Sequence, residues 1–109
     1  MGAATSMEGA LSEPIQLHVD LEVDPAKEAE LLKNFKTVFR PAIGKQPGFV
    51  DVKLLKTRNA PTRYRLLISF QTEEQRQKWV AADDHQRAWP AIEKTLTGKK
   101  FSATLFDPQ

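Results

Sequence analysis

Residues 64–75 of the chain read YRLLISFQTEEQ. The first seven positions carry large apolar side chains at every second residue, which is the period of a strand (Tyr64, Leu66, Ile68 and Phe70). The last four positions form a capping box, in which a hydroxyl and an amide three residues later satisfy free N–H groups at the start of a helix. The stretch therefore predicts a strand from Tyr64 to Gln71 that leads directly into a helix through Trp79.

The segment before this stretch predicts a strand that pairs with it. Residues 49–56 read FVDVKLLK, and the turn at 57–63 contains the breakers Asn59 and Pro61. Because the connection is so short, we expect the two strands to form an antiparallel hairpin.

The N-terminal half begins with another strand and helix. Apolar and polar residues alternate strictly from Ile15 to Val23, which predicts a half-buried strand. Asp24 and Pro25 supply a cap and a first helical residue, and apolar residues follow at helical spacing (Leu31, Leu32, Phe35, Val38, Phe39 and Ala42). We expect Pro41 to bend or end this helix and residues 44–48 to form a loop.

The C-terminal third predicts an interrupted helix and a last strand. Asp83-Asp84 is expected to restart the second helix after a break, and Pro90 to interrupt it again. Gly98 suits the position just past the helix end. Apolar and small residues then alternate from Phe101 to Leu105 in the fourth strand.

Strand, helix, hairpin, helix and strand is the ferredoxin-like βαββαβ order of an α+β fold. Right-handed crossovers put both helices on one face of a four-stranded antiparallel sheet. We expect one such domain over residues 15–109, after a flexible leader at 1–14. The other sheet face would carry Leu55 and Leu67 among polar groups, so we expect it to meet a second subunit.

Composition excludes several classes of protein. Sixteen Lys and Arg against fourteen Asp and Glu leave a net charge of only +2, which is too small to indicate nucleic acid binding. The segment 45–52 faintly resembles the aromatic signature of RNA-recognition domains, but the first strand has no aromatic residue on which a base could stack. The chain has no cysteine, which excludes disulfides and thiolate metal sites and favours a cytoplasmic setting.

The two histidines are candidate functional residues. His85 lies four residues before Trp89 on a helical stripe, which directs it toward the core side of the helix. Two interpretations are open: a pocket histidine that binds or deprotonates a ligand, or a structural histidine whose ring is satisfied by a backbone carbonyl or by Asp83 or Asp84. His18 is on the polar side of the first strand, at a solvated face, an interface or a pocket.

Aromatic residues dominate the predicted core, and two of them suggest a ligand site. Trp79 and Trp89 flank His85 and could wall a slot for a planar ligand. The spacing of the histidines matches no metal-ligand pattern, and the sequence has no glycine-rich phosphate loop. We therefore expect no metal and no cofactor.

In order and spacing, four pieces of this pattern resemble the antibiotic biosynthesis monooxygenase (ABM) domain family. They are Asp24–Lys27 after the first strand, the turn Pro47–Val50, the strand-to-helix stretch 64–74, and Trp79 with His85 six residues later. The resemblance covers nearly all of residues 15–106. It implies a homodimeric α+β barrel, in which two sheets meet through their open faces and each subunit keeps a pocket between sheet and helices.

The resemblance also implies a range of activities. Some members of the family insert oxygen into phenolic substrates without flavin, haem or metal, and others degrade haem. Haem degradation is disfavoured here, because Trp89 stands where that branch has its iron-binding histidine and the first strand contains no asparagine.

The predicted function is a cofactor-independent monooxygenase that acts on a small aromatic or quinol-like molecule with O₂. His85 is the predicted catalytic residue, and Trp79, Trp89 and Phe39 are the predicted substrate-binding residues. The alternative is a dimeric ligand-binding or structural relative without catalysis. An apolar pocket that reaches His85 would favour the enzyme, whereas an interior filled by the tryptophans would favour the alternative.

Overall fold

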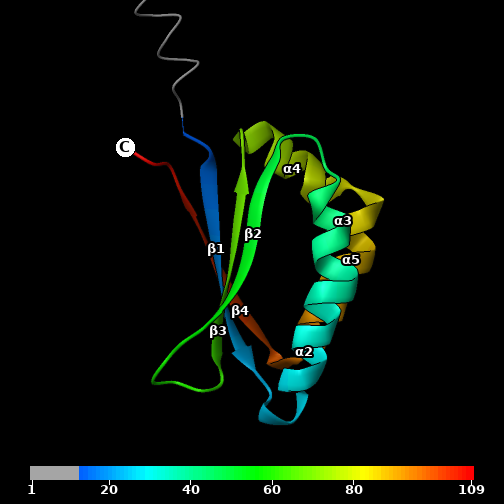
Figure 1. The fold of residues 1–109 in the computed structure, drawn as a ribbon, viewed down its shortest axis with the longest axis vertical. Coiled ribbons are helices and arrows are strands. Elements are labelled where there is room, and N and C mark those ends of the chain that lie inside the picture. The colour runs from blue at the N-terminus through cyan, green and yellow to red at the C-terminus, as the bar shows by residue number, and fades with distance from the viewer. Residues whose placement is uncertain (1–12) are drawn as a thin grey trace, which may run out of the picture.

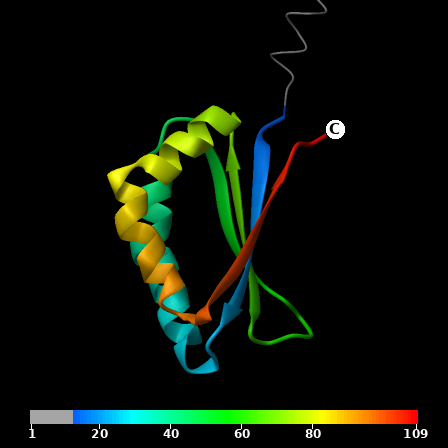
Figure 2. The ribbon, with the colours of Figure 1, turned by 180° about the vertical axis from the view of Figure 1, so that it is seen from behind.

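The computed structural model describes residues 13–109 of the chain, so nearly all of the predicted leader lies outside the described residues. Within them, the strands are β1 (Ile15–Val23), β2 (Phe49–Lys56), β3 (Arg63–Phe70) and β4 (Leu96–Phe106). The sheet order is β2-β3-β1-β4, and all neighbouring strands are antiparallel. Figures 1 and 2 show the helices together on one face of this sheet. The predicted ferredoxin-like βαββαβ fold is confirmed.

The helices begin where the capping residues predicted. A 3₁₀ turn (Pro25–Lys27) leads into α2 (Glu28–Asn34), and the Asp24 carboxylate accepts a hydrogen bond from the Ala26 N–H at 2.9 Å. The second helical segment consists of α4 (Glu73–Ala81) and α5 (Asp83–Glu93). The Thr72 hydroxyl accepts from the Gln75 N–H at 3.2 Å, and the predicted restart at Asp83 follows a residue in extended conformation, Ala82.

Pro41 does not end the first helix, which was one of the two outcomes that the sequence predicted. A π-helical segment (Phe35–Phe39) continues α2 into α3 (Arg40–Gly44). The Arg40 N–H donates to the Phe35 carbonyl five residues back, and this wider turn makes room for the proline ring near the start of α3. The helix ends at Gly44 instead.

The expectations for Pro90 and Gly98 were also wrong. Pro90 lies inside α5 on its exposed side, where water can bind the carbonyl that the proline leaves without a donor. Ala88 and Ile92 on the opposite side are fully buried and hold the helix in place. Gly98 lies within β4 and not after a helix; it adopts φ 59°, and Lys99 follows with φ 56°.

β1 determines which side chains face the helices, because it pairs with both β3 and β4. Leu21 lies opposite Tyr64 on one side and Phe101 on the other, which puts all three on the helix side of the sheet. His18 lies opposite Leu67 and Thr104, and these face away from the helices. We call this second side the open face.

A hydrogen-bonded cluster fastens α2 to the edge of the sheet. The Tyr64 hydroxyl donates to Glu28 Oε1 at 2.6 Å, and Lys56 Nζ lies 3.1 Å from the same oxygen. Tyr64 is buried, whereas the ion pair is partly open to water. The hydrogen bond from Tyr64, together with Lys56, lowers the pKa of the Glu28 carboxyl.

Replacing Tyr64 with phenylalanine should destabilise the domain. Loss of a hydrogen bond from a buried hydroxyl to a carboxylate costs about 1–2 kcal/mol, or roughly 5–10 °C in melting temperature for a domain of this size. The matched control is Arg65→Gln on the same strand, which breaks the exposed Arg65–Asp20 ion pair. That change should lower the free energy of unfolding by less than about 0.5 kcal/mol.

The difference between wild type and Tyr64→Phe should depend on pH. The pKa of Glu28 in the folded protein lies below its ordinary value of 4.5. The hydrogen bond therefore contributes fully to the free energy of unfolding above pH 4.5, and this contribution is lost as the pH falls through the folded pKa. Thermal melts from pH 7 to pH 3 measure this. A difference that stays constant to pH 3 would show that Glu28 does not strengthen the bond.

Candidate functional site

An aromatic row crosses the helix layer and ends at β4. It consists of Phe39, Trp79, His85, Trp89 and Phe101. Consecutive ring centroids lie 5.8, 5.0, 6.5 and 5.0 Å apart. The break between α4 and α5 produces this arrangement, because the extended Ala82 lets α5 restart with His85 edge-to-face on Trp79. The row therefore joins the π-helical segment, α4 and α5 to the sheet.

The row runs from the core to the surface. Phe39 and Trp79 are only 1% and 2% exposed, so both belong to the packed core. His85 and Trp89 are half-buried. Phe101 is 46% exposed. Of the four residues predicted for the site, His85 and Trp89 are thus open to contact from outside, whereas Phe39 and Trp79 support them from behind.

His85 carries a polar atom that the surrounding protein leaves without a partner. Its Nδ1 is buried and has no hydrogen-bond partner, the one such side-chain atom found in residues 13–109. The alternative in which a backbone carbonyl or a neighbouring aspartate satisfies this nitrogen is therefore not observed. Asp84 instead accepts from Gln46 Nε2 at 2.9 Å and pairs with Arg87.

Burial also affects the charge of the His85 ring. Desolvation lowers the pKa of His85 below its ordinary value of 6.5, because the half-buried ring cannot be solvated as a cation. The ring is therefore neutral at neutral pH, with one N–H. A buried Nδ1 without a partner costs stability in either tautomer, but buried N–H donors without an acceptor are rarer in proteins than acceptors without a donor. We therefore assign the proton to Nε2.

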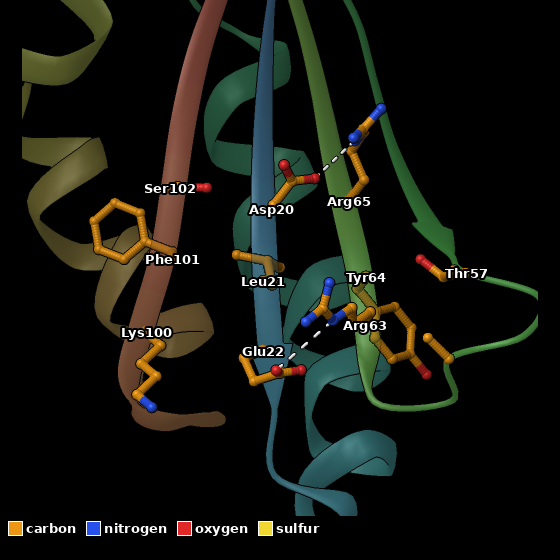
Figure 3. Close-up of a pocket in the computed structure, with 11 residues that line it drawn as sticks. Asp20, Leu21, Glu22, Thr57, Arg63, Tyr64, Arg65, Lys100, Phe101 and Ser102 are labelled. Carbon is orange, nitrogen blue, oxygen red and sulfur yellow. Dashed lines mark hydrogen bonds and ion pairs between the residues drawn. The ribbon is translucent and has the colours of Figure 1, made fainter.

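Phe101 is the member of the row that sequence reasoning missed as a site residue. Periodicity placed it in the last strand, but only the register with Leu21 puts it on the helix side beside Trp89. In Figure 3 its ring points outward from β4, away from the Asp20–Arg65 and Glu22–Arg63 pairs.

Two surface hollows lie elsewhere on the described chain. The larger, of about 540 Å³, is lined mainly by polar and charged residues of the open face (Figure 3), among them Asp20, Glu22, Arg63, Arg65, Lys100 and Ser102, and also by Leu21, Tyr64 and Phe101. The Asp20–Arg65 and Glu22–Arg63 pairs neutralise most of its charge. The smaller, of about 260 Å³, lies between α3 and α5. Neither of these two hollows is lined by His85.

The other histidine lies on the opposite side of the sheet. His18 Nε2 is 3.1 Å from Gln16 Oε1, and its ring packs on Phe106 with centroids 4.5 Å apart. The two histidines are therefore separated by the sheet. Among residues 13–109, no group of three or more His, Asp or Glu side chains could hold a metal ion, and no helix is long and apolar enough to cross a membrane.

Four antiparallel strands in the order β2-β3-β1-β4, covered by helices on one face, define a ferredoxin-like α+β domain. The sequence profile of the antibiotic biosynthesis monooxygenase family matches residues 14–91, which is most of the chain. The chain belongs to this family. No curated protein sequence matches it significantly.

Solved structures share this fold at low sequence identity. A conserved protein from Methanosarcina mazei Go1 is 16% identical with a TM-score of 0.80, covering 94% of this chain and 99% of that one. A candidate antibiotic biosynthesis monooxygenase from Caulobacter crescentus CB15 is 21% identical with a TM-score of 0.78, covering 90% and 92%. SnoaB, a cofactor-independent oxygenase from Streptomyces nogalater, is 19% identical with a TM-score of 0.77, covering 90% and 95%.

The His85 ring should titrate below pH 6.5. Because the folded state binds this proton less readily than the unfolded chain, stability should fall as the pH drops from 6.5 through the folded pKa. An NMR titration of the imidazole resonances, with His85 assigned by its absence in His85→Gln, measures the pKa directly. The His85→Gln variant should also lose less stability than wild type between pH 7 and pH 5. A His85 pKa at or above 6.5 would contradict the burial argument.

Proposed function

We propose that the protein is a cytoplasmic, homodimeric, cofactor-independent monooxygenase that acts on a small phenolic or quinol-like substrate. The observation that carries this proposal is the half-buried His85 ring, neutral and with a buried Nδ1 that has no protein partner, between Trp79 and Trp89. Membership of the family and the likeness to a cofactor-independent oxygenase support it.

We assign each predicted residue a role in this function. The Nε2–H of His85 donates a hydrogen bond to the substrate oxygen and stabilises the phenolate form, as a donor aimed at developing negative charge does. Trp89 packs against the substrate ring. Trp79 and Phe39, which are fixed in the core, hold His85 and Trp89 in position.

The chemistry comes from the substrate. The phenolic proton passes to water, the phenolate gives one electron to O₂, and the substrate radical and superoxide combine into a peroxide on a ring carbon that carries hydrogen. A proton from water converts the peroxide to the hydroperoxide, and loss of water, which takes the hydrogen of the same carbon, leaves a new carbonyl group. One oxygen atom therefore enters the product and the other leaves as water. This sequence requires no redox group from the protein.

A second function is favoured by one specific observation. Trp79 and Phe39 fill the interior behind His85, and His85 lines neither of the two hollows described for residues 13–109. A dimeric ligand-binding relative without turnover would have the same feature. The monooxygenase would consume O₂ with its substrate, whereas the ligand-binding relative would not.

Wild-type protein stripped of metals should consume O₂ with anthrones or naphthohydroquinones faster than their uncatalysed autoxidation. His85→Ala should lower the rate by at least about tenfold, because loss of one donor to a developing oxyanion typically costs 10²–10³. The matched control is His18→Ala, which removes the histidine on the other side of the sheet and should retain the rate. Wild-type rates equal to autoxidation would contradict the enzyme, and a requirement for added flavin or iron would contradict the cofactor-free mechanism.

We propose that the second subunit is a copy of this chain seated on the open face. That face combines apolar and charged side chains, including the exposed Leu55 and Phe106 at 44% each and the half-buried Leu67. A symmetric dimer would cover them, and a domain of 109 residues gains stability from burying such a surface.

Light scattering after size exclusion should therefore give about twice the chain mass of 12.3 kDa. Leu67→Glu puts a charge at the middle of the open face and should shift the protein to monomer. The control is Val38→Glu on the helix layer, which is 37% exposed and should leave the dimer intact. A wild-type monomer at micromolar concentration would contradict the dimer.

A further inference from the structure

The first turn of α5, which carries His85, has no apolar anchor of its own. The buried residues of α5 are Ala88 and Ile92, which lie further along the helix and are both 0% exposed. None of residues 81–87 is buried. Because a buried apolar face supplies most of the stability of a helix in a protein, the position of this turn depends on its polar contacts.

The Gln46 side chain holds this turn from the end of the first helix. Its Nε2 group donates hydrogen bonds to Asp84 Oδ2 at 2.9 Å and to the Ala42 carbonyl at 3.0 Å. The Gln46 N–H donates to the Ile43 carbonyl, and its carbonyl accepts from the Phe49 N–H, each at 3.1 Å. Gln46 is therefore fixed between α3 and the start of β2, and it ties the start of α5 to the neighbouring α3 (Figure 1).

The other side-chain contacts of the turn are more exposed. Lys45 Nζ lies 3.6 Å from Asp84 Oδ2 and Arg87 pairs with the other Asp84 oxygen, but these two cations are 65% and 70% exposed. Exposed ion pairs contribute little to stability. Gln86 Nε2 donates to a carbonyl at the end of α4 at 3.1 Å, and this bond is exposed too. The partly buried Gln46–Asp84 hydrogen bond is therefore the principal polar contact between this turn and another element.

The direction of the His85 ring follows from the position of this turn. Asp84 is the residue before His85, and the His85 ring lies edge-to-face on Trp79, with centroids 5.0 Å apart and planes at 79°. An edge-to-face contact depends on the angle of approach as well as on the distance. Trp79 is only 2% exposed and is held by the core, so a shift of the turn would move the His85 ring away from it.

We propose that Gln46 and Asp84 are positioning residues: the hydrogen bond between their side chains fixes the first turn of α5 and thereby the direction of the His85 ring. The inference rests on the proposed function for the use that is made of this ring. The position of the ring itself can be measured without turnover.

The hydrogen bond persists over the pH range in which His85 titrates. The bond from Gln46 lowers the pKa of the Asp84 carboxyl below its ordinary value of 3.8, and Lys45 and Arg87 act in the same direction. Asp84 is therefore a carboxylate at neutral and mildly acidic pH. It has two means of acting on His85, the hydrogen bond and its negative charge, and Asp84→Asn separates them because it removes only the charge.

The test follows the imidazole signals of His85 by NMR at pH 7. Asp84→Ala removes the acceptor, so the His85 signals should move toward those of a solvent-exposed histidine as the ring leaves the edge of Trp79. Asp84→Asn keeps an oxygen that accepts from Gln46 Nε2 and should leave the signals close to those of wild type. Gln46→Ala should reproduce the effect of Asp84→Ala, and the double variant should move the signals no further than either change alone.

The matched control is Glu73→Ala, which breaks a pair of the same spacing in the first turn of α4, where Arg76 Nε lies 2.6 Å from Glu73 Oε1. It should leave the His85 signals in place. With a substrate that supports O₂ consumption, Asp84→Ala should lower kcat about tenfold to a hundredfold with little change in KM, because misplacing a catalytic group costs rate more than binding. Asp84→Asn should rescue most of this loss, and Glu73→Ala should retain the wild-type kcat.

Two results would overturn the proposal. One is that the His85 signals of Asp84→Ala coincide with those of wild type. The other is an effect of Asp84→Asn as large as that of Asp84→Ala, which would mean that the charge acts on the ring and the hydrogen bond does not. Gln46→Ala, which removes the donor and keeps Asp84, takes the place of Asp84→Ala if that variant does not fold.

The same variants distinguish this proposal from the proposed function. Displaced His85 signals in a protein that consumes no O₂ would support the positioning role and reject the oxygenase. Oxygen consumption that Asp84→Ala does not alter would reject the positioning role and leave the oxygenase intact.

Discussion

The alternation of β1 is the constraint on which the rest of the structure depends. β1 is paired on both sides, so the direction of each of its side chains is imposed on β3 and on β4. Its apolar set faces the helices and includes Val19, Leu21 and Val23, each at most 5% exposed. A slip by one residue would expose that set and bury the polar set, which a core this small could not tolerate.

The same register places two exposed aromatic side chains on opposite sides of one strand. Phe101 pairs with Leu21 on the helix side and contacts Trp89, whereas Phe106 pairs with Gln16 on the open face and contacts His18. The two sides of β4 therefore carry different aromatic contacts.

The polar groups of the open face are largely paired within the chain. Asp20 pairs with Arg65 and Glu22 with Arg63 across neighbouring strands. Both pairs are substantially exposed, so each stabilises the isolated domain little. They do reduce the charge that a second copy would have to meet.

Most of the fold follows from periodicity and capping. The strand at 49–56 matches its prediction in both bounds, and Asp24 and Thr72 mark the helix starts because their side chains satisfy N–H groups that no helix can satisfy itself. The effect of the two prolines on their helices could not be predicted, because it depends on tertiary context. A π-helical turn accommodates Pro41, and buried neighbours hold the helix around Pro90.

The site was only partly predictable from sequence. His85 and the tryptophans share a helical stripe, so their proximity could be inferred. The sequence could not show that Phe39 and Trp79 are buried while Trp89 is partly exposed, because the burial of these rings depends on where β4 departs from the helices. Phe101 escaped notice because its partner, Trp89, is twelve residues away on another element, and only the strand register brings them together.

The most direct measurement for the central claim is a crystal structure of the protein with 2-naphthol bound. The account predicts the naphthol ring in contact with Trp89, and its oxygen at hydrogen-bond distance from His85 Nε2, roughly 2.7–3.2 Å. A naphthol bound instead in the open-face hollow beside Arg63 and Arg65, with His85 untouched, would contradict it.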